Sequence, residues 1–435
     1  MYLRFREKLS PWFYATALGC FLLALMSKPM AVSLPVVLAL LEWTSRRARN
    51  NEGFGLGGNE GTALVPARTI LLWLTPFFLF SLGAGVVTCI AQAKVGALQS
   101  LAVLPLFHRL GNAFVSYLTY LRRTVWPDDL CVSYVHPGFL APGAVTLAIL
   151  VLFLITWYAV KSRRKAPLII FGWLFFLVTL LPTIGLVQVG IQAMADRYAY
   201  LPLIGVLLIV TWIPFQFLSQ HRHEALFNLL ALAALLACGA LSFRQLACWR
   251  DSIVLFRRAV EVDPRNWVAR LGLGMALTQE RRFDEAPVHL KSALQSNQNG
   301  SEVHKKIGVC LYRKGDAHDA FQHWETALEL NPTRADVCFL MANALATHPD
   351  AAVRDGGLAV AFAEKGRARK PTLSLVDLMT LSAAYAEAGD FKEAIRYSDL
   401  VLERGSRMRD QEAVQEAAKR RQAYARDQAF YVSLP

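Results

Sequence analysis

The chain has 435 residues, of which 54% are hydrophobic and only 18% are charged, whereas an average soluble domain carries about 25% charged residues. Residues 1–243 hold 18 Lys and Arg against 8 Asp and Glu, and residues 244–435 hold 28 against 25. The positive surplus lies in short clusters between apolar runs rather than on one soluble face, which argues against a nucleic-acid partner. We predict an all-α protein: a multi-pass transmembrane helical domain over 1–243 and a soluble domain over 244–435.

Seven apolar runs in the first domain are candidate membrane helices, because a crossing needs about 20 apolar residues, with a range of roughly 17–25. The first two are short, flank Ser27-Lys28-Pro29, and could instead form a single kinked element. The runs are Trp12–Ser27, Met30–Trp43, Ile70–Ala91, Pro142–Val160, Pro167–Val187, Ala199–Leu218 and Ala225–Phe243.

Four basic clusters predict the orientation of these helices. They lie at Arg4 to Lys8, Arg46 to Arg49, Lys161 to Lys165, and around Arg222. Seven crossings place all four on one side, which should be cytoplasmic. We therefore expect a cytoplasmic N-terminus and an extracytoplasmic C-terminal domain. The compact loops and the lack of a dense cysteine set favour a bacterial inner membrane.

The apolar segment Leu101–Trp126 does not fit this pattern, because it contains Arg109, Asn112, Arg122 and Arg123. Counting it as a crossing would move the Lys161 to Lys165 cluster to the outside. We predict an amphipathic helix in the outer interface or a re-entrant segment.

Similar residues recur 34 positions apart after Trp249. Gly274 and Gly308 are one such pair, and the alanines at 286 and 320, and at 293 and 327, are two more. This is the tetratricopeptide period, in which each unit is a pair of helices. The pattern predicts an α-solenoid with a first half unit over Trp249–Pro264 and an insertion near 348–357. Such arrays bind peptides or partner proteins.

Motifs of soluble enzymes are absent: the sequence has no P-loop, HExxH, GxSxG or dinucleotide-binding fingerprint. The Gly53–Gly61 stretch is typical of a flexible linker. None of the seven cysteines forms a CxxC pair, and no metal-ligand spacing is present, so we predict no metal site from protein ligands alone.

Two cations at the predicted outer face are candidate ligands for a lipid phosphate. Arg197, between Asp196 and Tyr198, could hold a phosphate by bidentate hydrogen bonds, with Asp196 orienting it. The alternative is a helix N-cap by Asp196 beside a snorkelling Arg197. Lys28 is a second candidate of the same kind.

Three further outer-loop residues are candidates. Asp128 and Asp129 could form an acid/base or metal-binding pair, although adjacent carboxylates more often cap a turn or helix end. His136, which precedes Pro137, is most simply a loop residue.

Four segments together resemble a known family. They are Leu25 to Val32 (LMSKPMAV), Trp126 to Leu130 (WPDDL), Gln192 to Pro202 (QAMADRYAYLP), and Trp249 to Ser252 (WRDS) before the repeats. In this order they resemble the transmembrane and tetratricopeptide-containing O-mannosyltransferases and their bacterial relatives. The resemblance covers most of residues 1–264, and the segment around Arg197 is its most specific part.

The resemblance implies a C-type membrane glycosyltransferase that passes a mannose-like sugar from a polyprenyl phosphate to a protein hydroxyl, while the repeats bind the acceptor. It places a lipid-phosphate role on Arg197, with a divalent cation as a candidate cofactor. The family's acidic catalytic residues lie in the first outer loop, a region that this sequence is expected to lack at its N-terminus, so no catalytic residue is assigned. The alternative is a non-catalytic membrane scaffold whose repeats assemble envelope or secretion proteins.

Overall fold

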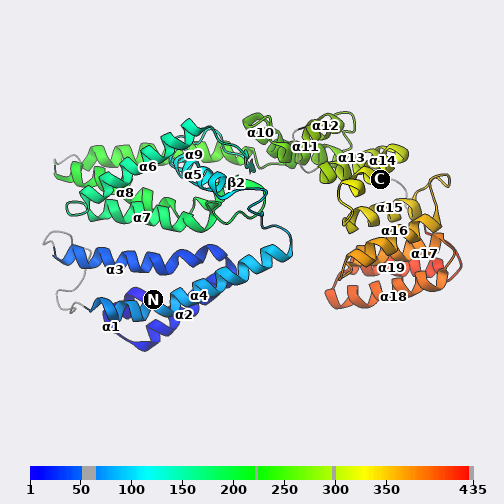
Figure 1. Ribbon diagram of the computed structural model, residues 1–435, viewed down its shortest axis with the longest axis horizontal. Coiled ribbons are helices and arrows are strands. Elements are labelled where there is room, and N and C mark those ends of the chain that lie inside the picture. Colours follow the sequence, from blue (N-terminus) through cyan, green and yellow to red (C-terminus); the bar gives the residue numbers. More distant parts are fainter. Residues whose placement is uncertain (51–64, 221–223, 296–299, 431–435) are drawn as a thin grey trace. The chain divides into compact units, whose positions relative to one another are not determined.

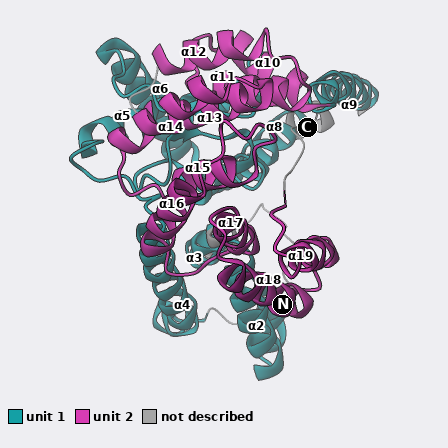
Figure 2. Ribbon diagram, turned by 90° about the vertical axis from the view of Figure 1, so that its right-hand side faces the viewer, with its two compact units in different colours: residues 1–250 teal, residues 251–435 magenta. Residues whose placement is uncertain are grey.

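The computed structural model describes residues 1–50, 65–220, 224–295 and 300–430. The predicted linker at Gly53–Gly61 and the basic cluster around Arg222 lie outside the described residues. The chain divides into two compact units, Met1–Arg250 (unit 1) and Asp251–Pro435 (unit 2), which Figure 2 colours separately. Each unit is described by itself.

Unit 1 is helical apart from one short antiparallel strand pair, and Figure 1 shows α3, α6, α7 and α8 running along its length. Each of the seven apolar runs contains a helix. The elements are α1 (Tyr2–Lys8), α2 (Pro11–Ser27), η1 (Pro29–Ser33), α3 (Leu34–Asn50), α4 (Ala67–Lys94), α5 (Leu106–Val125), β1 (Tyr134–Val135), α6 (Pro142–Ser162), α7 (Pro167–Leu180), η2 (Leu181–Thr183), β2 (Gln192–Met194), η3 (Asp196–Tyr198), α8 (Leu203–Gln220) and α9 (Glu224–Ala247).

Among the described residues of unit 1, three helices are long and apolar enough to cross a membrane: α4, α6 and α9. The apolar helices at Pro11–Ser27, Met30–Ser45, Pro167–Thr183 and Leu203–Pro214 are shorter. The number of crossings therefore stays a prediction.

Several helix boundaries differ from the prediction. The helix predicted to reach Val187 ends at Leu180, and the α-helix predicted from Met30 begins at Leu34 after a 3-10 turn. Proline explains two further differences. The helix predicted from Ala199 begins only at Leu203, because Pro202 disfavours a helical conformation at the residue before it. A short 3-10 turn, η3, precedes it instead. The amphipathic helix predicted from Leu101 begins at Leu106, directly after Pro105.

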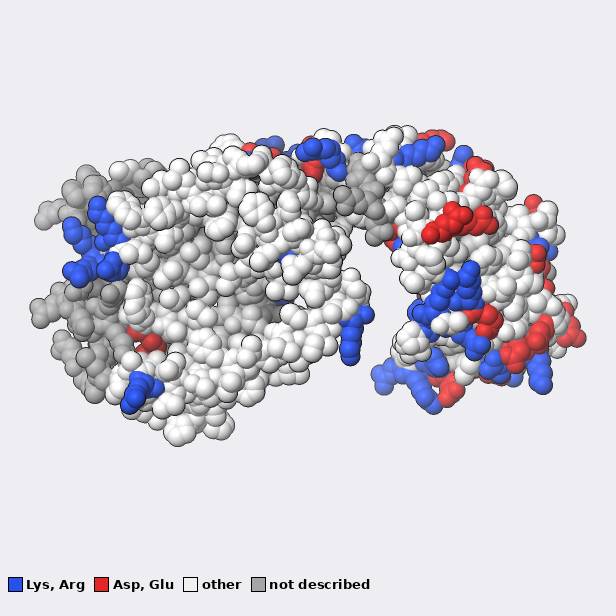
Figure 3. All heavy atoms as spheres, in the orientation of Figure 1, with Lys and Arg blue, Asp and Glu red and all other residues white. Residues whose placement is uncertain are grey.

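The surface of unit 1 is apolar over its middle. Leu72 on α4, Phe153 on α6 and Leu235 on α9 are each more than 60% exposed. On the face seen in Figure 3, the middle of the unit carries almost no charged side chains, and Lys and Arg gather near one end. A soluble monomer rarely exposes so large an apolar surface, so this pattern indicates membrane association.

Helices α7 and α8 touch backbone to backbone at two glycines. A Cβ atom on Gly172 would lie 2.4 Å from the carbonyl oxygen of Gly205, and one on Gly205 would lie 2.3 Å from that of Gly172. Small residues permit this approach, which is a common way to pack helices inside a bilayer. Around it, Trp173 and Phe176 form a stacked aromatic pair in the buried core.

Unit 2 is a series of antiparallel helix pairs after one leading helix. Asp251 caps that leading helix by accepting a hydrogen bond from the amide of Val254, 2.8 Å away. The helices are α10 (Ser252–Val262), α11 (Trp267–Gln279), α12 (Ala286–Gln295), α13 (Gly300–Lys314), α14 (Ala317–Leu330), α15 (Ala335–Thr347), α16 (Gly356–Arg369), α17 (Leu375–Glu387), α18 (Phe391–Met408) and α19 (Gln411–Tyr424).

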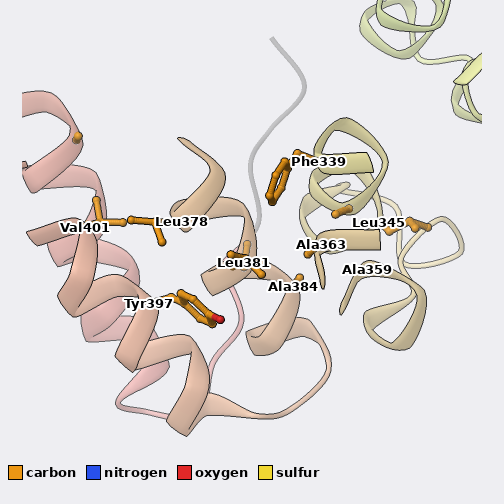
Figure 4. Packing of buried hydrophobic residues seen from close by; sticks show 14 residues of the cluster. Phe339, Leu345, Ala359, Ala363, Leu378, Leu381, Ala384, Tyr397 and Val401 are labelled. Atoms are coloured by element: carbon orange, nitrogen blue, oxygen red, sulfur yellow. The ribbon is translucent and has the colours of Figure 1, made fainter. Parts of the chain in front are cut away.

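The repeated small residues lie where paired helices meet, as the 34-residue period predicts. A Cβ atom on Gly274 would lie 2.6 Å from Leu290, and one on Gly308 would lie 2.4 Å from the indole of Trp324. Figure 4 shows a large core of the unit, where Phe339 and Leu381 pack among alanines of α15 to α17, and Tyr397 and Val401 of α18 join them. The all-helical repeat fold is confirmed, and the insertion forms the turn between α15 and α16.

Gly172→Val should destabilise unit 1 by about 1–3 kcal/mol, because its side chain cannot fit against the backbone of α8. Gly83→Val is the matched control, since a Cβ atom at Gly83 meets no atom within 4 Å. Both changes place the same β-branched residue in an apolar helix. Unfolding of the purified chain in detergent measures the difference, and equal losses for the two variants would contradict this packing.

Candidate functional site

The candidate site is built on the strap, which we define as residues 184–196 between α7 and η3. The strap pairs with two other segments. The amide of Gln99 donates to the carbonyl of Gln188 over 3.0 Å, and β2 within the strap pairs with β1. The amide of His136 also donates to the carbonyl of Ile191 over 2.8 Å. The strap is therefore held on both sides by backbone hydrogen bonds.

A stripe of polar side chains along α5 holds the strap by hydrogen bonds. Asn112 donates to the carbonyl of Ala193 over 3.0 Å. The hydroxyl of Tyr120 donates to the carbonyl of Ala195 over 2.9 Å and accepts from the amide of the same residue over 3.1 Å. The stripe consists, in order, of Arg109, Asn112, Tyr120 and Arg123. Successive members are three, eight and three residues apart, so they share one face of the helix.

Arg109 is a structural member of this stripe rather than an outer-loop cation. It is only 5% exposed and donates to the carbonyls of Gln99, Ser100 and Leu104 at distances of 2.8–3.1 Å. Carbonyl acceptors satisfy the guanidinium without a carboxylate, and they tie the loop before α5 to the helix.

The opposite face of α5 is apolar and points outward. Phe107 is 78% exposed, Leu110 is 40% exposed and Phe114 is 36% exposed. The polar face of this amphipathic helix is turned inward to the strap, which is the reverse of a helix on a water-soluble protein. Its placement at the membrane interface stays a prediction.

Asp196 lies at the end of the strap in a cluster of three side chains. The hydroxyl of Tyr134 donates to Asp196 Oδ2 over 2.7 Å, and an Arg123 guanidinium nitrogen is 3.4 Å from Oδ1. The guanidinium of Arg123 also stacks 4.1 Å over the Tyr134 ring and donates to the carbonyl of Asp129 over 3.1 Å. The N-cap alternative for Asp196 is wrong, because Ala195 holds the N-cap position of η3 and the apolar helix begins only at Leu203.

Burial sets the protonation of this cluster. Burial raises the pKa of Asp196, and the hydrogen bond from Tyr134 and the charge of Arg123 partly offset the shift. Burial also raises the pKa of Tyr134, and the neighbouring Asp196 carboxylate raises it further. Tyr134 therefore remains a neutral hydrogen-bond donor at physiological pH.

Arg197 is displayed outward from this anchored turn. Its side chain is exposed, lies 5.2 Å over the Tyr198 ring, and reaches the amide oxygen of Gln192 at 3.5 Å. No carboxylate within the described ranges lies within ion-pair distance of Arg197, so its charge faces solvent. Asp196 does not pair with Arg197; it binds Arg123 and Tyr134 instead, and thereby holds the turn that presents Arg197.

The other predicted site residues lie in separate surroundings. Lys28 is exposed at the start of η1, which packs against α4 and η2. Asp128 and Asp129 both bind Arg122, at 3.4 and 2.7 Å. His136 accepts a hydrogen bond from the amide of Gly138 through Nδ1, and burial lowers its pKa.

These surroundings do not form a metal site. Across the part of the chain that the structure describes, no group of three His, Cys, Asp or Glu side chains could hold a metal ion. The two carboxylates of the WPDDL segment are paired with Arg122, and no third acidic, histidine or cysteine ligand joins them within the described residues.

The sequence analysis missed Arg123 as a site residue. The signal was available in the spacing of polar residues at 109, 112, 116, 120 and 123, which form one helical stripe. Asn112 and Tyr120 bind backbone groups of the strap, and Arg123 binds the side chain of Asp196. These partners lie more than 70 residues away, and a single sequence does not reveal them.

Comparison with known proteins gives distant similarity. The chain is 29% identical over 144 residues to the protein O-mannosyl-transferase Tmtc2 of Drosophila melanogaster, covering 33% of this chain and 15% of that protein. It is 28% identical over 214 residues to Tmtc1 of the same organism, covering 46% and 22%. The chain thus spans less than a quarter of the length of these relatives. No protein-family model matches it.

Two solved structures resemble this chain only weakly by TM-score. YrrB, described as a TPR protein with an unusual peptide-binding site, gives a TM-score of 0.30 at 17% identity, covering 47% of this chain and 96% of that one. Yeast Tom70 gives 0.34 at 16% identity, covering 97% and 90%. The repeat fold is therefore assigned from the pairing of the chain's own helices.

Arg123→Met should loosen the end of the strap by about 1–3 kcal/mol, because it removes the cation that pairs with the Asp196 carboxylate and donates to the Asp129 carbonyl. The single hydroxyl of Tyr134, which lies within hydrogen-bond distance of both groups, cannot replace the guanidinium at each of them. Hydrogen exchange of residues 192–201 in the purified chain measures this loss as faster exchange.

Arg122→Met is the matched control, because the side chain of Arg122 is 48% exposed and exposed ion pairs contribute at most about 1 kcal/mol. Equal acceleration in the two variants would show that the buried arginine does not hold the strap.

Proposed function

We propose that this chain is a membrane glycosyltransferase-family protein that transfers a mannose-like sugar from a polyprenyl-phosphate donor to a protein hydroxyl. The similarity to protein O-mannosyl-transferases supports the reaction class. The repeats of unit 2 would bind the protein acceptor, since helical repeat arrays commonly bind peptides.

The observation that carries the proposal is the outward guanidinium of Arg197, which is anchored through the adjacent Asp196 but lacks a carboxylate of its own among the described residues. A phosphate with two oxygens in one plane fits the guanidinium fork. In this reading Asp196, Arg123 and Tyr134 position the turn, and Arg197 meets the ligand.

The proposed reaction breaks the bond between the sugar C1 and the phosphate oxygen, while the acceptor hydroxyl oxygen bonds to C1. The electron pair of the broken bond leaves with the polyprenyl phosphate, and the hydroxyl proton passes to a base or solvent. Arg197, with Lys28 as a second candidate, would stabilise the charge that develops on the departing phosphate.

The proposed topology places this chemistry outside the cell. The basic loop at Lys161 to Lys165 would be cytoplasmic, and the strap, η3 and unit 2 would be extracytoplasmic, in a bacterial inner membrane. A lipid-borne donor suits that location, because its phosphate lies at the membrane surface.

Arg197→Ala should lower sugar transfer from a polyprenyl-phosphate donor by about 10- to 100-fold, since one charge-assisted hydrogen bond contributes about 1.5–3 kcal/mol. Arg197→Lys should retain part of the activity, because it keeps the charge but loses the fork. The assay measures transfer of labelled sugar by the full chain in proteoliposomes.

Lys165→Ala is the control, an exposed cation of the predicted cytoplasmic loop. Equal transfer by the Arg197→Ala variant and the parent would remove Arg197 from the mechanism. Absence of transfer by the parent, with partner proteins still retained on the repeats, would favour the scaffold alternative.

A further inference from the structure

Five charged side chains form one network between α13 and the start of α15. Lys305 Nζ is 2.9 Å from Glu302 Oε1 and 2.9 Å from Asp336 Oδ2. Arg334 is 2.5 Å from Glu302 Oε2 and 2.6 Å from Asp336 Oδ2. Each carboxylate is therefore bound by both of these cations.

Lys306 is the surplus cation of the network. Its Nζ atom is 3.9 Å from Glu302 Oε1, beyond hydrogen-bond distance, and its side chain is only 30% exposed. Burial lowers the pKa of Lys306, and the neighbouring Lys305 lowers it further. Three cations thus share two carboxylates, and the one with the poorest contact is half-buried.

A second cation lies on the same face of α13. Arg313 follows Lys306 by seven residues, which is nearly two helical turns, and Val309 lies between them. Arg313 is half-buried, and no carboxylate in the described ranges lies within ion-pair distance of it. At 1.5 Å per residue the two positions are about 10 Å apart along the helix.

This spacing matches a particular peptide geometry. In a polyproline II helix, residues three apart point to the same side and are about 9 Å apart, from a rise of 3.1 Å per residue. Two carboxylates at such positions would reach both cations at once. The half-buried Val309, which packs against the core of α14 and α15, lies between the cations along the helix.

We infer that the face of α13 bearing Lys306, Val309 and Arg313 binds an extended protein segment with two acidic residues three positions apart. The inference rests on the proposed function only for the identity of this segment as part of the acceptor protein. Binding of the peptide can be measured without any sugar transfer.

The experiment uses the full chain in detergent micelles and a fluorescein-labelled peptide with two glutamates separated by Pro-Ser. Lys306→Gln and Arg313→Gln should each weaken binding by up to about fivefold, because an exposed ion pair contributes up to about 1 kcal/mol. Raising the salt concentration should weaken binding by the parent. A peptide of the same composition with adjacent glutamates should bind less tightly.

Lys392→Gln is the control, because Lys392 is an exposed lysine on α18 of the same unit and its loss should leave binding unchanged. Circular dichroism melting checks that each variant folds. Arg313 takes no part in the ion-pair network, so Arg313→Gln tests binding without disturbing that network. Unchanged binding by both single variants, or equal binding of a peptide with glutamine at both positions, would overturn the inference.

Parallel transfer assays separate the two proposals. Absence of peptide binding by the parent chain, with its transfer activity intact, would count against this inference alone. Peptide binding without any transfer by the parent chain would count against the proposed function alone.

Discussion

Exposure of apolar side chains on α4, α6 and α9 is the constraint on which unit 1 depends. A surface of this kind is stable only where lipid replaces water, and lipid offers no hydrogen bonds to backbone or charged groups. Polar groups must therefore find partners within the protein. This explains why Arg109 is saturated by carbonyls and why the polar face of α5 is turned toward the strap. The contact between Gly172 and Gly205 packs the backbone of α7 directly against that of α8.

The strap, which is held by these inward-facing polar groups, presents one charged side chain to the outside. Its backbone is hydrogen-bonded to β1, to the segment before α5, and to side chains of α5. Asp196 closes the arrangement by binding Arg123 and Tyr134, and the next residue, Arg197, is left facing outward. A cation on an anchored turn of this kind would lose little backbone entropy when a phosphate binds, as the proposed lipid-phosphate role of Arg197 requires.

Much of the fold was predictable, because the positions of the helices follow from local patterns in the sequence. Apolar run length located the helices of unit 1, and the 34-residue spacing of Gly274 and Gly308 located the repeat contacts. The site was predicted less completely. Arg197 and Asp196 were identified from their place at the predicted outer face, and the family resemblance added a lipid-phosphate role for Arg197, but the partners of Asp196 were not predicted. Its true partners lie 62 and 73 residues earlier in the chain, and such pairings follow from tertiary packing that residue spacing does not encode.

The proposed function depends on the orientation of the chain, and labelling of singly introduced cysteines in intact cells tests it most directly. Lys165→Cys lies in the loop between α6 and α7, and Lys419→Cys lies on α19, in a chain whose non-buried cysteines 20, 89, 238 and 248 are replaced by alanine. A membrane-impermeant maleimide should label the Lys419→Cys variant before lysis and the Lys165→Cys variant only after lysis. Labelling of the Lys165→Cys variant in intact cells, or protection of the Lys419→Cys variant, would contradict the account.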